Sequence, residues 1–307
     1  MKERELEHLY HEGVKWDGKY FETVYHAVEL YEDPKQLKKA IGRFLSRKNR
    51  GEFKLTNPYS KQIWLRQLIP SMLKYPENSE LEGYRTWEEA LQQGGIAVCF
   101  VTITHDEWAC CDENIQFDLQ RAKQKVRNAF IGLSFIATFE AAYYVNENWT
   151  TDGVEGNLIS FHCHAIVWAT HKSQLMRHRG RIKRRFRPIL GNKSGIRFDT
   201  IKTEEGLCKS VRYQAKMPFY GKRTVREGTK KKQKDAKLSY IQHYRLFKAL
   251  QKYDLLDVWV AGGDGSVVLR DAKSRLAQYR KEWRSRPIGA SHPGIFGVGN
   301  GGSYLRV

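Results

Sequence analysis

The chain has 307 residues, which is enough for one large domain or for a core domain with appendages. Hydrophobic residues make up 41% and aromatic residues 12%, so the composition supports a folded core and argues against wholesale disorder. The formal net charge of +19 predicts a polyanionic partner, with nucleic acid as the first candidate and an anionic membrane surface as the second.

The sequence has no apolar stretch long enough to span a bilayer, and its first residues do not resemble a signal peptide. We therefore expect a protein that is not inserted in a membrane. The five cysteines are odd in number and include no Cys-x-x-Cys pair, which indicates reduced thiols and a cytoplasmic location.

Residues 1–93 are mostly polar and contain two helical patterns. The first, over 33–51, has one apolar face and one face covered by lysines and arginines. The second, over 59–76, is expected to break at Pro70. We predict a basic helical N-terminal region, which is either an accessory DNA-binding or docking element or a solvated subdomain packed on the core.

Residues 94–220 have the clearest pattern. Apolar stretches rich in β-branched residues predict strands, and three- and four-residue apolar spacing predicts helices. The predicted elements in chain order are strand 95–104, helix 115–133, strand 134–146, strand 157–169, basic helix 172–191, strand 194–203 and helix 204–218. The order β-α-β-β-α-β-α predicts an α+β fold, an antiparallel sheet with helices on one face.

Residues 221–307 form a basic C-terminal extension whose role the sequence does not define. Its lysine-rich start, 221–237, is predicted to be a loop, and 240–253 a helix. The stretch 257–271 has the pattern of a small hairpin, and the end of the chain is rich in glycine.

Two histidines interrupt the apolar strand 157–169. Side chains alternate between the faces of a strand, so His162 and His164 point the same way, about 7 Å apart along the strand. A short polar connection folds the preceding strand back on this one, which brings Glu140 within a residue of position 163. Two imidazoles and a carboxylate on one face form an open site for a divalent ion. The alternative is two ordinary core histidines and a solvent-facing glutamate.

The helix 204–218 offers a second set of polar residues. Lys209, Tyr213 and Lys216 lie at positions i, i+4 and i+7, so they share one helix face. A phenol between two ammonium groups is suited to holding and attacking a phosphate, although most tyrosines on helices are packing residues.

In these residues the sequence resembles the HUH endonucleases, specifically the one-tyrosine rolling-circle replication initiators. Three ordered motifs carry the resemblance: "FVTIT" (100–104), "FHCHAIVW" (161–168) and "VRYQAK" (211–216). "FEAAYYVN" also places Glu140 where the plasmid initiators of this family have a metal-binding acid. The resemblance covers residues 96–218 and leaves both ends of the chain unexplained.

The resemblance implies that residues 94–220 are a nuclease core with a ferredoxin-like or RNA-recognition-motif-like fold. It implies a Mg²⁺ or Mn²⁺ cofactor and a single-stranded origin DNA with a hairpin at the nick site. A host helicase and polymerase would act after nicking. The family pattern leaves the oligomeric state open.

The resemblance also implies residue roles. Tyr213 would attack a phosphodiester and stay joined to the 5′-phosphate, Lys216 would help to place that phosphate, and Glu140, His162 and His164 would hold the ion. The DNA-binding residues would be Lys209 and Arg212 on the tyrosine helix together with Arg177, Arg179, Arg181, Lys183, Arg184, Arg185 and Arg187, and the lysine run 230–237 would grip the DNA backbone.

Three other functions remain compatible with parts of the pattern. A single-strand DNA transposase uses the same histidine pair and tyrosine. A two-histidine, one-carboxylate iron oxygenase shares the ligand set but leaves the charge of +19 without a role. A non-catalytic nucleic-acid-binding protein would need the histidines only as structural residues.

Overall fold

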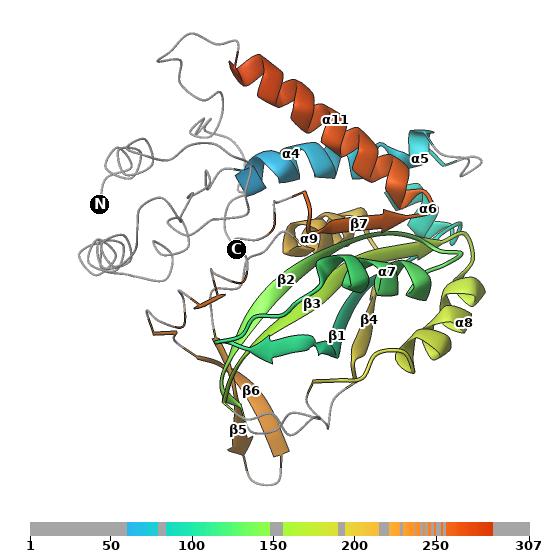
Figure 1. Cartoon of the computed structure of the whole chain (residues 1–307). Coiled ribbons are helices and arrows are strands. Elements are labelled where there is room, and N and C mark those ends of the chain that lie inside the picture. The colour runs from blue at the N-terminus through green and yellow to red at the C-terminus, as the bar shows by residue number, and fades with distance from the viewer. Residues whose placement is uncertain are drawn as a thin grey trace.

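The structure is a computed structural model that describes residues 60–78, 84–147, 156–189, 194–214, 221–227, 230–236 and 256–284, with scattered positions between 238 and 253 (Figure 1). Several sequence predictions lie outside these residues: the helix over 33–51, the glycine-rich end of the chain and Lys216. The described fold is α+β, with helices around a curled sheet.

The sheet contains seven described strands in the spatial order β4-β1-β3-β2-β5-β6, with β7 also paired to β2. Their bounds are β1 Ala97–Cys111, β2 Ser134–Glu147, β3 Gly156–Ala169, β4 Ile196–Ile201, β5 Gly221–Glu227, β6 Lys230–Ala236 and β7 Trp259–Gly262. Neighbouring strands are antiparallel except β2 and β5, which form a short parallel pair. The predicted antiparallel sheet is therefore confirmed in its central strands, and a parallel contact is added at one end.

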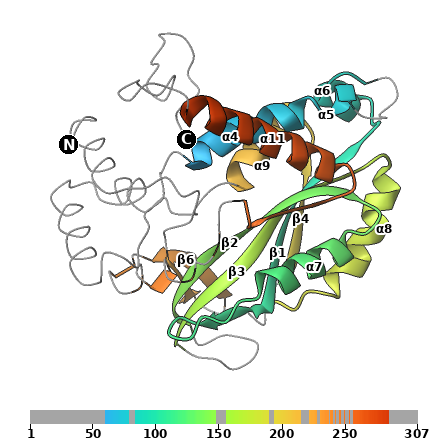
Figure 2. The ribbon, with the colours of Figure 1, turned by 45° about the horizontal axis from the view of Figure 1, so that its top comes forward.

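Helices lie on both faces of the sheet (Figure 2). Their bounds are α4 Ser60–Leu73, α5 Tyr75–Asn78, α6 Trp87–Gln92, α7 Leu119–Ala129, α8 Lys172–Lys183, α9 Glu204–Gln214 and α11 Gly265–Arg284. The predicted order β-α-β-β-α-β-α is present as β1-α7-β2-β3-α8-β4-α9. The expectation of helices on one face holds for α7 and α8 but is wrong for α9, α4 and α11, which cover the opposite face.

The apolar face of the sheet has a dense aromatic core. Phe161 of β3 stacks on Phe117, with ring centroids 3.9 Å apart, and Phe135 of β2 contacts Phe130 at the end of α7. The helix α7 is capped at its N-terminus by Asp118, whose side chain accepts a hydrogen bond of 2.9 Å from the backbone N–H of Arg121. This cap explains why the helix starts later than its apolar spacing predicts.

The opposite face is covered by tryptophan-rich contacts. Trp64 of α4 lies against Trp259 of β7, and Trp87 of α6 lies edge-on to Trp168 of β3. The helix α4 continues through Pro70 instead of breaking there, because a proline within a helix removes one backbone donor without removing the packing of its apolar face. Segments from both sides of the predicted core therefore pack into the same hydrophobic cluster.

Two predictions for the C-terminal extension are wrong. Residues 221–236 contain the hairpin β5–β6 rather than a loop, because β2 offers a strand edge on which β5 can start. The segment 257–271 is not a hairpin: β7 pairs with β2 and leads into α11. Gly265 begins that helix directly against β2, where an added Cβ would lie 1.9 Å from the carbonyl oxygen of Phe135.

Within the described residues, every helix is too short or too polar to cross a membrane. All five cysteines are described, and none of them forms a disulfide.

Candidate metal centre and nucleophile

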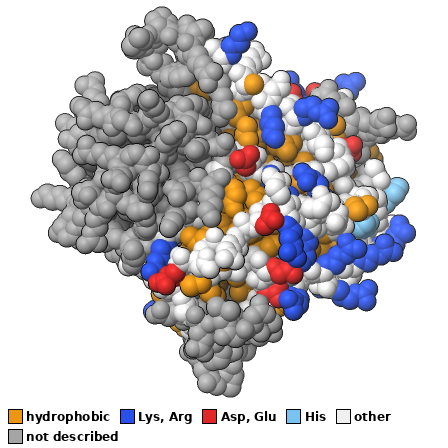
Figure 3. Space-filling model, viewed as in Figure 1, with side chains coloured by type: hydrophobic (Ala, Val, Ile, Leu, Met, Phe, Trp, Pro, Cys, Tyr) orange, Lys and Arg blue, Asp and Glu red, His pale blue; other side chains and the backbone are white. Residues whose placement is uncertain are grey.

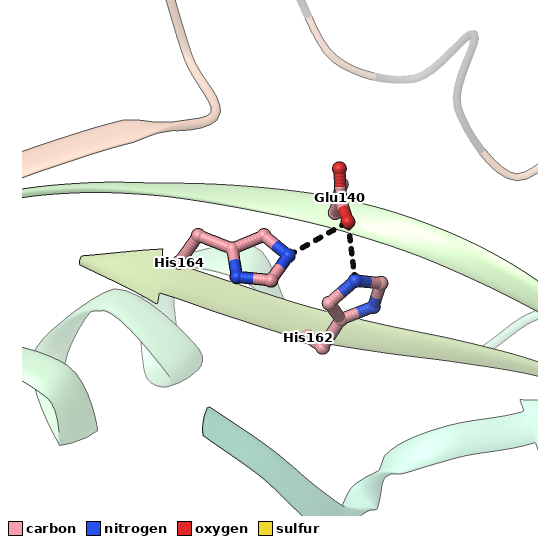
Figure 4. Close-up of side chains that lie close together, drawn as sticks. All are labelled: Glu140, His162 and His164. Carbon is pink, nitrogen blue, oxygen red and sulfur yellow. Dashed lines mark hydrogen bonds and ion pairs between the residues drawn. The ribbon is translucent and has the colours of Figure 1, made fainter. Parts of the chain in front are cut away.

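The two predicted histidines and the glutamate come together at the centre of the sheet (Figure 4). The register of β2 and β3 places Glu140 directly opposite His162. One carboxylate oxygen, Oε1, lies 2.5 Å from Nε2 of His162 and 2.8 Å from Nε2 of His164. The strand alternation and the hairpin pairing expected from the sequence are therefore both confirmed.

This arrangement fits a divalent cation. The three ligand atoms lie within 4.8 Å of one another, and the ligands of one ion at bonds of about 2.1 Å are themselves about 3 Å apart. Glu140 is only 5% exposed, and its second oxygen, Oε2, has no hydrogen-bond partner in the described part of the chain. A buried carboxylate oxygen without a partner is costly, and an ion would satisfy it.

The charge state of Glu140 also suits an ion. Burial alone would raise the pKa of the carboxyl group, but the charge of His162 and His164 in their protonated form, together with their hydrogen bonds, outweighs burial and lowers the pKa to about 2. The group is thus a carboxylate at neutral pH, which is the form that binds a cation.

A threonine orients one of the imidazoles. Oγ1 of Thr102, on β1, lies 3.1 Å from Nδ1 of His164. If Nδ1 carries the proton and donates it to this hydroxyl, Nε2 presents its lone pair to the site, as metal-binding histidines do. The ring of Phe100 stacks on the same imidazole with centroids 5.3 Å apart and fixes its plane.

The predicted nucleophile lies beside this centre. The ring of Tyr213 meets the ring of His164 edge-on, with centroids 5.1 Å apart, and also contacts Phe100 at 5.5 Å. Tyr213 is nevertheless 46% exposed, so its side chain is accessible to a large ligand. Partial burial and the charge of Glu140 raise the pKa of its phenol, while Arg197 of β4 opposes that increase.

A neighbouring glutamine fixes the end of the tyrosine helix to the sheet. The side-chain amide of Gln214 is buried, and Nε2 donates to the carbonyl oxygens of Ile136 at 2.9 Å and His164 at 2.8 Å. These carbonyls belong to β2 and β3, the strands that carry the three ligands. Gln214 therefore holds α9, and Tyr213 with it, at a fixed height above the metal centre.

The basic residues predicted on the tyrosine helix are either exposed or lie outside the described residues. Lys209 and Arg212 are exposed, and the Nζ atom of Lys209 lies 2.7 Å from a carboxylate oxygen of Glu205, one turn earlier. Lys216 lies outside the described residues, so its predicted contact with the phosphate stays a prediction.

The predicted DNA-binding residues of α8 and of the segment that follows it lie on the opposite face of the sheet from Tyr213. The side chain of Arg179 covers the ring of Phe198, Arg185 donates to the carbonyl of Asn128, and Arg187 forms an ion pair of 2.8 Å with Asp106. The other members, Arg177, Arg181, Lys183 and Arg184, are exposed on this side of the molecule, where Figure 3 shows a group of blue side chains. Three of these seven basic residues, Arg179, Arg185 and Arg187, thus have contacts within the protein as well.

Sequence reasoning missed three residues of the site: Thr102, Arg197 and Gln214. Thr102 belongs to the motif over 100–104, and period-two alternation places it on one face of its strand together with Phe100. Which strand lies beside β1 is set by a pairing between residues 62 positions apart, and no local pattern encodes that pairing.

Comparison of the chain with protein families, with curated proteins and with solved structures found no match.

Proposed function

We propose that this protein nicks and joins single-stranded DNA at a specific site, as an HUH-type endonuclease that initiates rolling-circle replication of a plasmid or phage. The observation that carries the proposal is the contact between the exposed phenol of Tyr213 and His164, a member of a buried Glu/His/His group. An accessible nucleophile beside a cation site is suited to transfer of a phosphodiester.

The order of the central strands supports the same proposal. The four strands β4-β1-β3-β2 with the crossover helices α7 and α8 on one face have the order of the β-α-β-β-α-β ferredoxin-like fold. The HUH nucleases that the sequence resembles are expected to have this type of core.

The chemistry follows from the residues on the site's face. The oxygen of Tyr213 forms a bond to the phosphorus, the bond to the 3′ oxygen breaks, and that oxygen takes a proton while the phenol loses one. The products are a 5′-phosphotyrosine and a free 3′-OH. Glu140, His162 and His164 would hold Mg²⁺ or Mn²⁺, which when bound would polarise the phosphate.

The other predicted features have roles in the same scheme. The net charge of +19 suits binding to a phosphate backbone, and the free 3′-OH would serve a host polymerase acting with a host helicase. Such a reaction takes place in the cytoplasm. A single-strand transposase would use identical chemistry, so the genetic neighbourhood of the nick site distinguishes the two.

The test is formation of a covalent protein–DNA adduct. The purified chain is incubated with a labelled single-stranded oligonucleotide pool and Mn²⁺ or Mg²⁺, and the products are separated on a denaturing gel. We expect an adduct that requires metal and is lost in Tyr213→Phe. Tyr220→Phe is the matched control and should retain the adduct. An adduct that persists in Tyr213→Phe would overturn the assignment of the nucleophile. Lack of any adduct with the wild-type chain would overturn the proposed activity.

A further inference from the structure

The hairpin β5–β6 is a two-stranded ribbon that extends beyond the rest of the sheet (Figure 1). β5 pairs with β2 at Gly221 and Lys222 alone among the described residues, opposite Tyr143 and Tyr144. The two strands pair with each other through seven consecutive residue pairs, and the last five of these, from Arg223 to Glu227, lie beyond the contact with β2. The ribbon is therefore anchored at its base and extends away from the core.

The ribbon is strongly basic. Its two strands contain seven lysines and arginines and two acidic residues, a formal net charge of +5 over 14 residues. The register places two exposed basic residues, Arg223 and Lys234, opposite each other, while Lys222 forms an ion pair of 2.7 Å with Asp235 opposite it. The excess of positive charge suits the ribbon to an anionic partner.

We propose that the β5–β6 ribbon binds double-stranded DNA in its major groove, beside the strand that is cut. The proposal rests on the proposed nicking function and specifies its substrate as a nick site next to a duplex. A major groove about 12 Å wide admits a two-stranded ribbon, whose strands lie about 5 Å apart. Arg223 and Lys234, which lie opposite each other and so share one face of the ribbon, would contact the phosphates that line the groove.

The position of the ribbon relative to the metal centre defines the substrate further. Tyr143, at the base of the ribbon, lies three residues after Glu140 on the same strand, which is about 10 Å. That distance corresponds to about three base-pair steps of DNA. The duplex bound by the ribbon would therefore begin within one helical turn of the phosphate that Tyr213 attacks.

The experiment measures duplex binding without cleavage. The probes are a labelled 20-base-pair DNA of arbitrary sequence, its single strand, and an RNA duplex of the same sequence, each titrated by fluorescence anisotropy over a range of salt. The variant Arg223→Gln/Lys234→Gln removes two exposed charges from the ribbon. The variant Arg270→Gln/Lys273→Gln removes two exposed charges from α11 and serves as the matched control.

We expect the ribbon variant to bind the DNA duplex at least about tenfold more weakly, with a salt slope reduced by about 2, since each phosphate contact contributes about 0.9. Binding to the single strand should fall by less than binding to the duplex, because only the duplex has a groove that admits the ribbon. The control variant should bind the duplex like the wild type. The RNA duplex should bind weakly to every variant, because its deep major groove does not admit a ribbon.

Other outcomes overturn the proposal. Equal loss of single-strand and duplex affinity, or equal binding of the RNA duplex, would exclude a major-groove contact. Ribbon-dependent binding to phosphatidylserine vesicles that exceeds binding to the duplex would indicate a membrane surface instead.

If adducts form while duplex affinity is unaffected by the ribbon variant, the inference fails and the nicking function stands. If duplex affinity falls as expected but no adduct forms, the inference about the ribbon stands and the proposed nicking function fails. Should the double variant fail to fold, Arg223→Gln alone should show about half the change in slope.

Discussion

The two faces of β2 and β3 are built from alternate residues of the same strands, yet they have opposite properties. On one face Phe139, Phe161 and Cys163 are buried among other apolar side chains. On the other, Glu140 and His164 are equally buried but polar. The first face follows the ordinary logic of a core, in which burial of apolar surface stabilises the fold.

The second face does not follow that logic. Removing a carboxylate from water costs several kcal/mol, a cost that the interactions of Glu140 with the two histidines must offset. The residues that stabilise the fold and the residues that would carry the function therefore lie on opposite faces of the same two strands. Substitutions on the two faces should therefore affect different measurements, and this expectation can be tested.

The largest effect should come from Glu140→Gln, which keeps the shape of the side chain and removes its charge. Without the carboxylate, the site loses its one anionic ligand, and metal-dependent adduct formation should fall by about 10³-fold, since a metal supplies several kcal/mol of charge stabilisation. Rates are measured by quantifying adduct over time. The control is Cys163→Ala, which lies between the two histidines on the opposite face and should keep the wild-type rate. A normal rate in Glu140→Gln would exclude the metal assignment.

The complementary substitution is Phe161→Ala on the apolar face. It removes a ring that stacks on Phe117, and the free energy of unfolding should fall by about 3–5 kcal/mol. Urea denaturation measures this loss. At low temperature, where the variant is folded, adduct formation per folded molecule should match the wild type. A selective loss of activity in a fully folded variant would show that the two faces are not independent.

A smaller effect is expected from Gln214→Leu, which removes the two hydrogen bonds between α9 and the strands. The phenol would then be less well positioned, and misplacement by about 1 Å can cost about 10²-fold in rate. We expect slower adduct formation with an unchanged increase in melting temperature on addition of Mn²⁺. If the metal-induced increase disappears as well, Gln214 supports the ligands rather than the nucleophile.

The smallest effect should come from Thr102→Val, which replaces the hydroxyl near His164 with a methyl group of similar size. Loss of such a partner weakens metal affinity by about 10- to 100-fold, and isothermal titration with Mn²⁺ measures it. Saturating metal should restore most of the adduct rate. A variant that binds metal with wild-type affinity would show that Thr102 does not orient the imidazole.

The metal centre could be predicted from the sequence because its three ligands lie on two strands joined by a short connection. Period-two alternation set the common face of His162 and His164, and the hairpin set the approximate position of Glu140. The contact of Tyr213 with His164 could not be predicted from local patterns. The helix α9 reaches the sheet only after α8 and β4, and no local pattern defines that path.

The failures have physical reasons as well. The lysine-rich stretch over 221–236 has poor intrinsic strand propensity, but pairing with β2 outweighs that propensity. The β-branched pair Val267 and Val268 suggested a strand, although the apolar spacing continues at helical intervals to Leu276 and α11 forms instead. In the first case a tertiary contact outweighed the local propensity, and in the second the longer helical pattern outweighed the two β-branched residues.

The anchoring of Gln214 has a consequence for how the reaction would proceed in both directions. One side chain joins β2, β3 and α9, so Tyr213 is tied to the strands that carry Glu140, His162 and His164. We expect this anchor to stay in place while one DNA end is exchanged for another. We therefore expect strand exchange to depend on the DNA, with the outgoing 3′ end diffusing away and the incoming one replacing it. The rate of rejoining should then vary with the concentration of acceptor strand.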